Sequence, residues 1–322
     1  MARSIAAIAA LTGLLAGAPF AHAEYPDHPI RIVVPYTPGG TVDVLARLLG
    51  PRLTEVWGQP VVVENRPGAG GNIGADFVAK SPPDGYTLFL STNAPLTINV
   101  AAYQNIKYDP LRDFTPITVA GENAVLLVAN PSLPATSIKE LIALAKAKPG
   151  ELSAGTSGLG TTAHLSLALF NKLAGVEIRH IPYRGGVPSL TAAVANEVPM
   201  TFSDIVPSTP LVRDGRLKGL ATTGQRRAGI APDTPTMSEA GLPGFDIVTT
   251  IWFVAPGGTP MEIVHRLNRE VIRALNDPEL RGKLKTLGID PLGNTPEEAA
   301  EFLRKELPRW KVLVTEAGVK LE

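Results

Sequence analysis

The chain has 322 residues, and its 30 lysine and arginine residues balance its 30 aspartate and glutamate residues. This balance provides no overall positive field that would attract nucleic acid or an acidic membrane. The chain has no cysteine, which excludes disulfides, thiol catalysis and thiolate metal sites.

The histidines give no metal motif either. Beyond residue 23 they are His28, His164, His180 and His265, and no two are spaced as ligands on one helix. We therefore expect no metal site.

The first 23 residues have the pattern of an export signal. Arg3 supplies a positive charge, residues 5–15 are an apolar run too short to span a bilayer, and Ala21-His22-Ala23 fits a cleavage site. No cysteine lies near this site, so a lipid anchor is not expected. The sequence predicts export to the periplasm with cleavage after Ala23.

The mature sequence begins with a strand, a glycine turn and a helix. The β-branched run over residues 30–34 predicts a buried strand, and Gly39-Gly40 permits a tight turn. Apolar residues at helical spacing then predict a helix, with Thr41 as its N-cap and Asp43 in its first turn. An open helix N-terminus can bind an anion through backbone N–H groups, although the turn could also serve only as a connection.

Alternation of strands and helices continues to residue 94. The predicted elements are a strand over 60–65, a glycine-rich loop over 66–72, a helix over 73–80 and a strand over 86–90. This order is typical of a mostly parallel sheet covered by helices, in which ligands bind beyond the carboxyl ends of the strands. Residues 95–118 are less regular.

The second half of the chain repeats this alternation of strands and helices, and the C-terminal segment then returns to the first unit. The predicted elements are strands over 124–129, 152–155, 177–182, 198–202 and 217–222, helices over 138–147 and 164–173, a strand over 245–255, and helices from 262, 278 and 296. Thr295 is the expected N-cap of the last helix. We predict two α/β lobes, residues 24–124 with 246–322 and residues 125–245.

Two enzymatic interpretations are weak. Gly158-Leu159-Gly160-Thr161-Thr162-Ala163 fits a dinucleotide fingerprint, but the acid at a suitable distance, Glu177, precedes the second strand instead of ending it. Ser157, His164 and Asp204 suggest a hydrolytic triad, but the serine lacks the G-x-S-x-G context. We therefore expect no cofactor and no catalytic residues. The open helix N-termini at Gly40-Thr41 and Gly160-Thr161 instead suit a small anion between the lobes.

Taken together, the motifs resemble the Bug/TctC family of periplasmic solute receptors, which serve tripartite tricarboxylate transporters. The matching segments are 25–26, 29–31, 34–47, 63–74, 83–88, 157–158 with 161 and 164–165, 181–186, 202–204, and 252 with 255–260. The resemblance implies an α/β, two-lobe periplasmic binding protein of the type II-like Venus flytrap kind, with the ligand in the cleft between the lobes. It implies a small organic acid as ligand and transient contact with integral membrane transporter subunits. We expect a monomer that binds no nucleic acid.

The resemblance also implies that the loops over 36–43 and 157–164 hold the ligand carboxylate, partly through ordered waters. The expected ligand-binding residues are Tyr36, Thr37, Gly39, Gly40, Thr41, Asp43, Asn93, Ser157, Gly158, Thr161, His164, Tyr183 and Asp204. Residues 91–93 carry no diagnostic motif, so the identity of the acid stays open. A ligand sensor without a transporter and an exported hydrolase are the alternatives.

Overall fold

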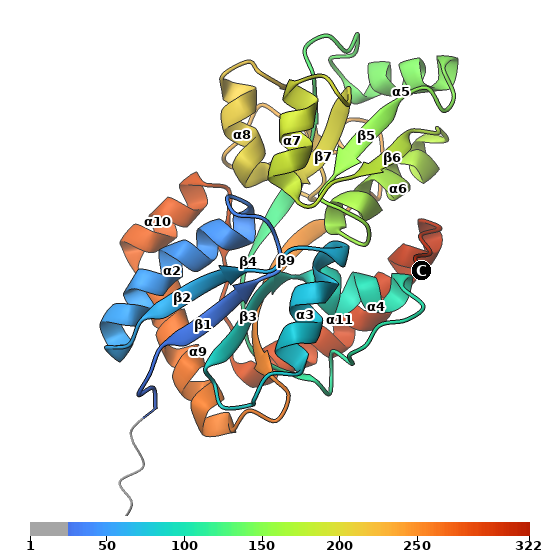
Figure 1. The fold of residues 1–322 in the computed structure, drawn as a ribbon. Helices are drawn as coiled ribbons and strands as arrows, with labels where there is room; N and C mark the ends of the chain where they lie inside the picture. Colours follow the sequence, from blue (N-terminus) through green and yellow to red (C-terminus); the bar gives the residue numbers. More distant parts are fainter. Residues whose placement is uncertain (1–24) are drawn as a thin grey trace, which may run out of the picture.

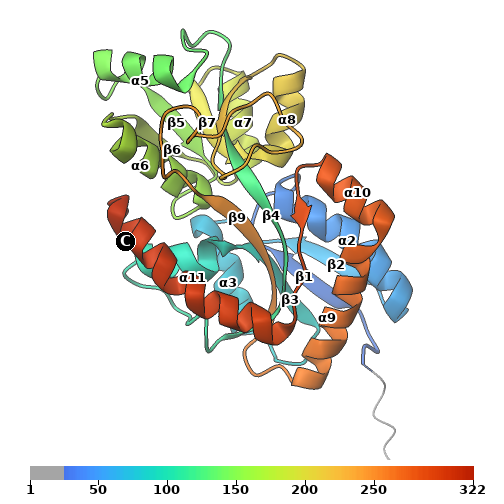
Figure 2. The same cartoon turned by 180° about the vertical axis from the view of Figure 1, so that it is seen from behind.

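The computed structural model describes residues 25–322, so the predicted signal segment and its cleavage site lie outside the described residues. The described chain forms two α/β lobes, and two long strands, β4 (Phe114–Ala129) and β9 (Val248–Pro256), run between them (Figure 1). The view from behind shows the same two strands connecting the lobes (Figure 2). The predicted two-lobe α/β architecture is confirmed.

Lobe 1 is built on the strand order β2-β1-β3-β9-β4. Strand β1 (Ile30–Val34) pairs in parallel with β2 (Val61–Asn65) and β3 (Thr87–Thr92), whereas β9 runs antiparallel to β3 and β4. The helical and 3₁₀ or π segments of this lobe are α2 (Thr41–Trp57), η1 (Ala69–Gly71), α3 (Asn72–Ala79), η2 (Ala94–Ile98), α4 (Asn99–Ala102), α9 (Met261–Asn276), α10 (Pro278–Thr286) and α11 (Pro296–Glu316).

Ile32, Val33 and Val34 of β1 are buried on both faces of the sheet, because helices cover both sides, whereas Arg31 near the start of the strand is exposed. Ile32 and Val34 belong to a core cluster shared with α2 and α9. Val33 points to the opposite face and packs in a cluster that includes residues of α3 and α11. The apolar run over residues 32–34 is therefore explained by burial on two sides.

Lobe 2 repeats this plan on a smaller scale. Strand β5 (Ser153–Thr156) pairs in parallel with β6 (Arg179–Pro182) and β7 (Met200–Asp204), and β7 joins β4 in the antiparallel direction. Strand β8 (Lys218–Thr222) also pairs with β4. The helices are α5 (Ile138–Ala147), α6 (Thr162–Ala174), α7 (Gly186–Val194) and α8 (Ile205–Arg213).

Strand β4 belongs to both lobes. Residues 114–124 pair with β9, and residues 125–129 pair with β7. The prediction that residues 95–118 are less regular and that a strand begins at 124 was therefore wrong for 114–123, and η2 and α4 occupy residues 94–102. Pro116 and Gly121 disrupt the strand pattern in the sequence, but β9 on one side and the short strand β10 (Asp290–Pro291) on the other supply hydrogen-bond partners. The register shifts near Pro116 and near Gly121 accommodate these residues.

The last helix, α11, packs against both lobes. Thr295 and Glu298 form the reciprocal hydrogen bonds of a capping box, so the predicted N-cap is confirmed. Leu303 packs in the core of lobe 1, whereas Trp310 joins a cluster that contains residues of lobe 2. Lys172 on α6 donates a hydrogen bond from Nζ to the Glu316 carbonyl oxygen over 2.6 Å.

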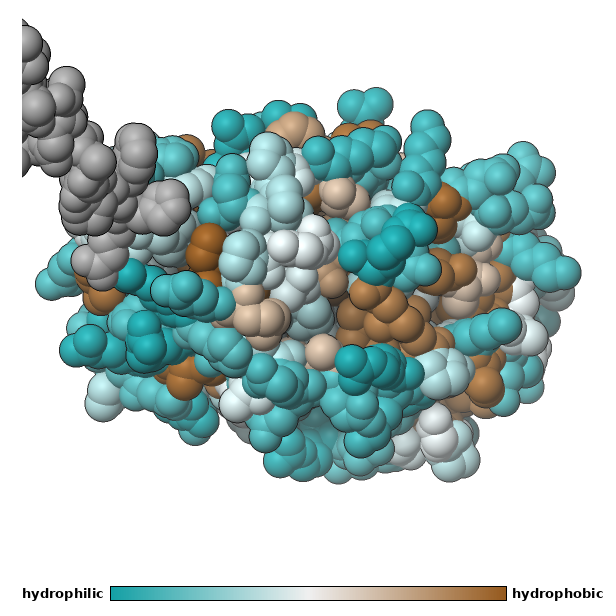
Figure 3. All heavy atoms as spheres, turned by 90° about the horizontal axis from the view of Figure 1, so that it is seen from below, coloured by the Kyte–Doolittle hydropathy of each residue, from teal (hydrophilic) through white to brown (hydrophobic). Residues whose placement is uncertain are grey.

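The face shown in Figure 3 is mainly hydrophilic, and apolar side chains occur on it in several places. Within residues 25–322, no helix has the length and apolar character needed to cross a membrane.

Candidate functional site

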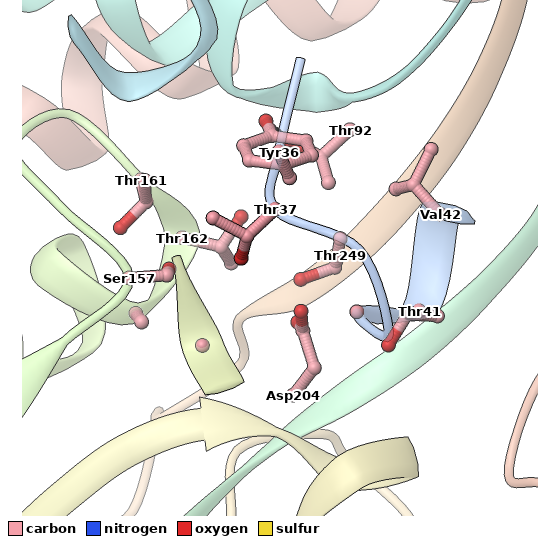
Figure 4. Close-up of a pocket in the computed structure, with 13 residues that line it drawn as sticks. Tyr36, Thr37, Thr41, Val42, Thr92, Ser157, Thr161, Thr162, Asp204 and Thr249 are labelled. Carbon is pink, nitrogen blue, oxygen red and sulfur yellow. Dashed lines mark hydrogen bonds between the residues drawn. The ribbon is translucent and has the colours of Figure 1, made fainter. Parts of the chain in front are cut away.

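A narrow cavity lies between the lobes (Figure 4). It is lined by Tyr36, Thr37, Gly40, Thr41, Val42, Thr92, Ser157, Thr161, Thr162, Ala163, Gly186, Asp204 and Thr249. Its volume of about 20 Å³ has room for about one water molecule. A solute of several carbon atoms can therefore enter only when the lobes move apart.

Four helix N-termini converge on this cavity. Helix α2 begins after Gly40, α6 after Thr161, α7 after Gly185 and α8 after Asp204. Each helix follows the carboxyl end of a strand, β1, β5, β6 or β7, which explains why they meet at one edge. The first N–H groups of a helix have no intrahelical partner and carry partial positive charge, so this arrangement favours an anion.

Two buried hydroxyls on the cavity wall have no hydrogen-bond partner among the described residues. They are Thr41 Oγ1 on α2 and Thr249 Oγ1 on β9, and both residues are about 1% exposed. The prediction that Thr41 is the N-cap of α2 was wrong, because Gly40 has the extended backbone of the cap and Thr41 is already helical. The Thr41 hydroxyl is therefore available to a guest. Buried hydroxyls without partners are costly, so they indicate a missing ligand or water.

Tyr36 closes one side of the cavity. Its hydroxyl lies 2.6 Å from Thr92 Oγ1, and burial raises the pKa of Tyr36 to about 12. The phenol therefore stays neutral at ordinary pH and serves as a hydrogen-bonding group.

Asp43 organises the loop around the cavity and does not line it. Its carboxylate accepts hydrogen bonds from Gly39 N, Arg47 Nε and Asn65 Nδ2, each over 2.9 Å. Burial opposes ionisation of Asp43, but these donors outweigh it, so the pKa of Asp43 lies below its ordinary value. The Gly39 N–H group is engaged in its hydrogen bond to Asp43, and Gly39 does not line the cavity either.

In lobe 2, a hydrogen-bond network shapes the loop before α6. Thr161 Oγ1 donates to the Gly158 carbonyl oxygen over 2.8 Å and accepts from His164 N over 3.3 Å. His164 Nδ1 accepts from Gly160 N over 3.2 Å, and Thr156 Oγ1 lies 2.6 Å from His180 Nε2. His164 thus holds the loop through its hydrogen bond with Gly160 and does not line the cavity.

The two histidine rings stack with their centroids 4.1 Å apart. Burial lowers the pKa of His164 to about 3 and that of His180 to about 4, and the neighbouring His180 adds to the effect on His164. Both rings are neutral at ordinary pH, as the Nδ1 acceptor role of His164 requires.

At Gly70, Gly160 and Gly185 the backbone lies directly against an oxygen atom of the opposite lobe. A Cβ atom at Gly70 would overlap the Leu159 carbonyl oxygen, one at Gly160 would overlap Asn99 Oδ1, and one at Gly185 would overlap Thr37 Oγ1. In each case the second residue belongs to the opposite lobe. The structure is therefore a closed arrangement in which backbone approaches the other lobe directly.

Seven of the thirteen predicted site residues line the cavity: Tyr36, Thr37, Gly40, Thr41, Ser157, Thr161 and Asp204. The other predicted residues lie around it. Asp43, Gly39 and His164 support the loops, and Asn93 accepts a hydrogen bond from Thr162 across the lobes. Gly158 and Tyr183 line a second cavity of about 200 Å³, which shares Tyr36 and Ser157 with the first and is also lined by Arg184.

Sequence reasoning missed six lining residues: Val42, Thr92, Thr162, Ala163, Gly186 and Thr249. Thr162 and Ala163 follow directly from the predicted N-terminus of α6. Thr249 had no such signal, because it reaches the cavity only through the path of β9 between the lobes.

The lining contains one carboxyl group, that of Asp204, and no lysine, arginine or histidine among the described residues. Burial raises the pKa of Asp204 to about 6 from its ordinary value, and a hydrogen bond with the Asn123 side chain opposes this rise. An anion in this cavity would therefore be held by neutral donors, without a salt bridge.

Comparisons with known protein sequences place the chain in a family. A family model described as "Tripartite tricarboxylate transporter family receptor" matches residues 45–319. Protein BugT of Bordetella pertussis is 39% identical over 308 residues, which cover 95% of this chain and 94% of that protein.

Solved structures are similar over most of the chain. An R. palustris protein solved with adipate has a TM-score of 0.89 at 39% identity, covering 92% of this chain and 99% of that chain. The periplasmic binding protein BugD has a TM-score of 0.88 at 32% identity, with coverages of 92% and 100%. MatC of Rhodopseudomonas palustris with bound malate has a TM-score of 0.84 at 34% identity, with coverages of 90% and 100%.

Proposed function

Because the chain belongs to the tripartite tricarboxylate transporter family receptors, we propose that it captures a small carboxylate-bearing solute in the periplasm and delivers it to the membrane subunits of such a transporter. The ligand binds in the cavity between the lobes. Adipate and malate, which accompany two similar structures, are the first candidates.

One observation carries this proposal. Helix N-termini from both lobes face one cavity, together with the unpartnered hydroxyls of Thr41 and Thr249. Hydrogen bonds to a charged group contribute roughly 1.5–3 kcal/mol each, so a few such donors suffice for micromolar binding. Since donors come from α2 in lobe 1 and from α6 in lobe 2, an acid that bridges them stabilises the closed form.

Calorimetry with adipate, malate and related acids tests the binding. Gly40→Pro removes an N–H group at the cavity, and Arg184→Ala removes a cation that is exposed and lines the neighbouring cavity. We expect one bound acid per chain, a large loss of affinity for Gly40→Pro and little change for Arg184→Ala, with circular dichroism confirming that each variant folds. Loss of binding in Arg184→Ala alone would show that a salt bridge holds the carboxylate.

Delivery is tested separately by uptake of the labelled acid in cells that lack the receptor. The wild-type gene should restore uptake, and a variant that no longer binds should not. If binding occurs in vitro and uptake does not depend on the protein, it serves as a sensor.

The remaining expectations form part of the same proposal. Cleavage occurs after Ala23, the protein is a monomer, and it returns the acid chemically unchanged. The lobes comprise residues 24–124 with 246–322 and residues 125–245. The change of partner along β4 after Ala124 supports this boundary. Intact mass, light scattering and analysis of the acid after incubation test the first three points.

A further inference from the structure

Asp204 brings a carboxyl group into the cavity proposed to bind a carboxylate. It is the N-cap residue of α8, yet its side chain makes no capping hydrogen bond to that helix. The carboxyl group instead points into the cavity, toward the region of Thr37 and Thr249 (Figure 4). The carboxyl group is therefore placed to meet a guest.

Among residues 25–322, no lysine or arginine side chain lines the cavity beside this carboxyl group. The charged or titratable side chains on the surrounding elements, within the described chain, are Tyr36 before α2, Asp43, Arg47, Arg52 and Glu55 on α2, Glu122 on β4, His164 and Lys172 on α6, Arg184 before α7, Arg213 on α8 and Lys218 on β8. His164 is neutral at ordinary pH, because burial lowers its pKa to about 3. Lys172 and Lys218 donate to the carbonyl oxygens of Glu316 and Leu133, and Arg184 is exposed. Tyr36 interacts with Asp204 but stays neutral at ordinary pH.

The remaining charges are engaged or distant. Arg47 is paired with Asp43, and Arg52 is paired with acids of the α9–α10 region. Glu122 lines a different cavity, and Arg213 is exposed beside Asp214. A ligand carboxylate in the cavity would thus lie beside Asp204 without a compensating positive side chain.

Two carboxylates that share a small, poorly solvated site do not both stay ionised, because their repulsion raises one pKa. We propose that the receptor binds its acid together with one proton, which Asp204 and the ligand carboxylate share. This inference rests on the proposed function and narrows the ligand to organic acids without a cationic amine. An ammonium group would neutralise Asp204 directly and would need no proton.

The electrostatics of the ligand-free site favour proton uptake. Burial already raises the pKa of Asp204 to about 6. Near neutral pH, a small further rise of this pKa caused by the bound anion is therefore enough to protonate Asp204. A shared proton would also let the Asp204 hydroxyl donate to the ligand, in addition to the hydroxyls of Thr41 and Thr249.

Calorimetry with adipate, and with malate as second probe, measures the proton directly. At pH 7.5 the binding enthalpy is recorded in buffers with different ionisation enthalpies, and the slope gives the protons taken up. We expect close to one proton for the wild type and an affinity that falls by about tenfold per pH unit above pH 7. Asp204→Asn should bind without proton uptake, and at pH 8.5 it should bind at least as tightly as the wild type.

Glu122→Gln is the matched control, because Glu122 is a partly buried acid on the neighbouring strand that lines another cavity. This variant should take up the same number of protons on ligand binding as the wild type. A proton uptake near zero when the wild type binds the acid would overturn the inference. Loss of binding in a folded Asp204→Asn at every pH would also overturn it, since Asp204 would then act as a charged acceptor.

A ligand-free measurement separates this inference from the proposed function. The pKa of Asp204 is about 6 in the folded protein and ordinarily 3.8, so ionisation destabilises the fold as the pH rises through this range. The melting temperature of Asp204→Asn relative to the wild type should therefore increase by about 2 °C or more between pH 4 and pH 8. If neither acid binds, the proposed ligands are wrong. If the difference in melting temperature between Asp204→Asn and the wild type is the same at pH 4 and pH 8, Asp204 does not take up a proton in this range and the inference is wrong.

Discussion

Thr162 Oγ1 on α6 donates a hydrogen bond to Asn93 Oδ1 over 3.2 Å, and this bond joins the two lobes beside the cavity. Asn93 follows β3 in lobe 1 and is fully buried, and its Nδ2 has no partner among the described residues. Because the bond exists only while the lobes are together, it contributes to the closed form and not to the stability of either lobe.

Removal of this bond should weaken ligand binding by favouring the open form. For Asn93→Ala and for Thr162→Val we expect a threefold to tenfold lower affinity, from a net hydrogen-bond contribution of roughly 0.5–1.5 kcal/mol. Calorimetry on both single variants and on the double variant gives the coupling between the two residues. Fully additive losses would show that the bond does not stabilise closure.

The two threonines at the helix N-termini should respond differently to loss of their hydroxyls. Thr41 Oγ1 has no hydrogen-bond partner in the described part of the chain, so Thr41→Val should leave the melting temperature nearly unchanged and lower the affinity by about tenfold. Thr161→Val removes the N-cap of α6 and should also cost about 1 kcal/mol of stability. Thermal unfolding and calorimetry on both variants separate these effects. Equal stability losses would contradict the assignment of Gly40 as the cap of α2.

The parts of the site that depend on local chain geometry could be predicted from the sequence. A β-branched run, a glycine turn and a helix pattern are short-range signals, so they locate β1 with α2 and β5 with α6 within a few residues. Parallel strands place their carboxyl ends at one edge, which is enough to bring Thr37, Gly40, Ser157 and Thr161 together.

Features that depend on long-range pairing could not be predicted. Residues 114–123 contain Pro116 and Gly121 and look irregular, yet β9 and β10 make them part of a strand. Thr249 faces the cavity because β9 crosses between the lobes, a relation without a local pattern. The hydrogen-bond partners of Asp43 and His164, Gly39 and Gly160, likewise had no pattern in the sequence that would identify them.

The stacked histidines should make the protein sensitive to acid. Their pKa values of about 3 and about 4 in the folded protein lie below the ordinary value of 6.5, so the unfolded chain binds more protons below that pH. Stability should therefore fall as the pH is lowered from 6.5 toward 4. A tenfold difference in proton affinity between the folded and unfolded chain corresponds to about 1.4 kcal/mol, so the pair should account for a few kcal/mol.

Melting temperatures between pH 7 and pH 4 test this prediction. His164→Asn keeps an acceptor for Gly160 N but cannot be protonated, so its melting temperature should depend less on pH than that of the wild type. His265→Gln changes an exposed histidine and serves as the control, with the pH dependence of the wild type. An unchanged pH dependence in His164→Asn would show that other groups cause the acid sensitivity.

Closure itself can be tested at Gly160 with Gly175 as a matched control. Both glycines flank α6, with φ of 71° and 61°, so alanine should cost each about 1 kcal/mol of stability through backbone strain alone. At Gly175 a Cβ atom would meet no atom of residues 25–322 within 4 Å, whereas at Gly160 it would overlap Asn99 Oδ1 of the opposite lobe. Gly160→Ala should therefore lower ligand affinity by tenfold or more, because the lobes cannot approach fully. Gly175→Ala should keep the wild-type affinity. Small-angle scattering with saturating acid should show a more extended particle for Gly160→Ala only, and equal affinities in the two variants would mean that this contact is not needed for closure.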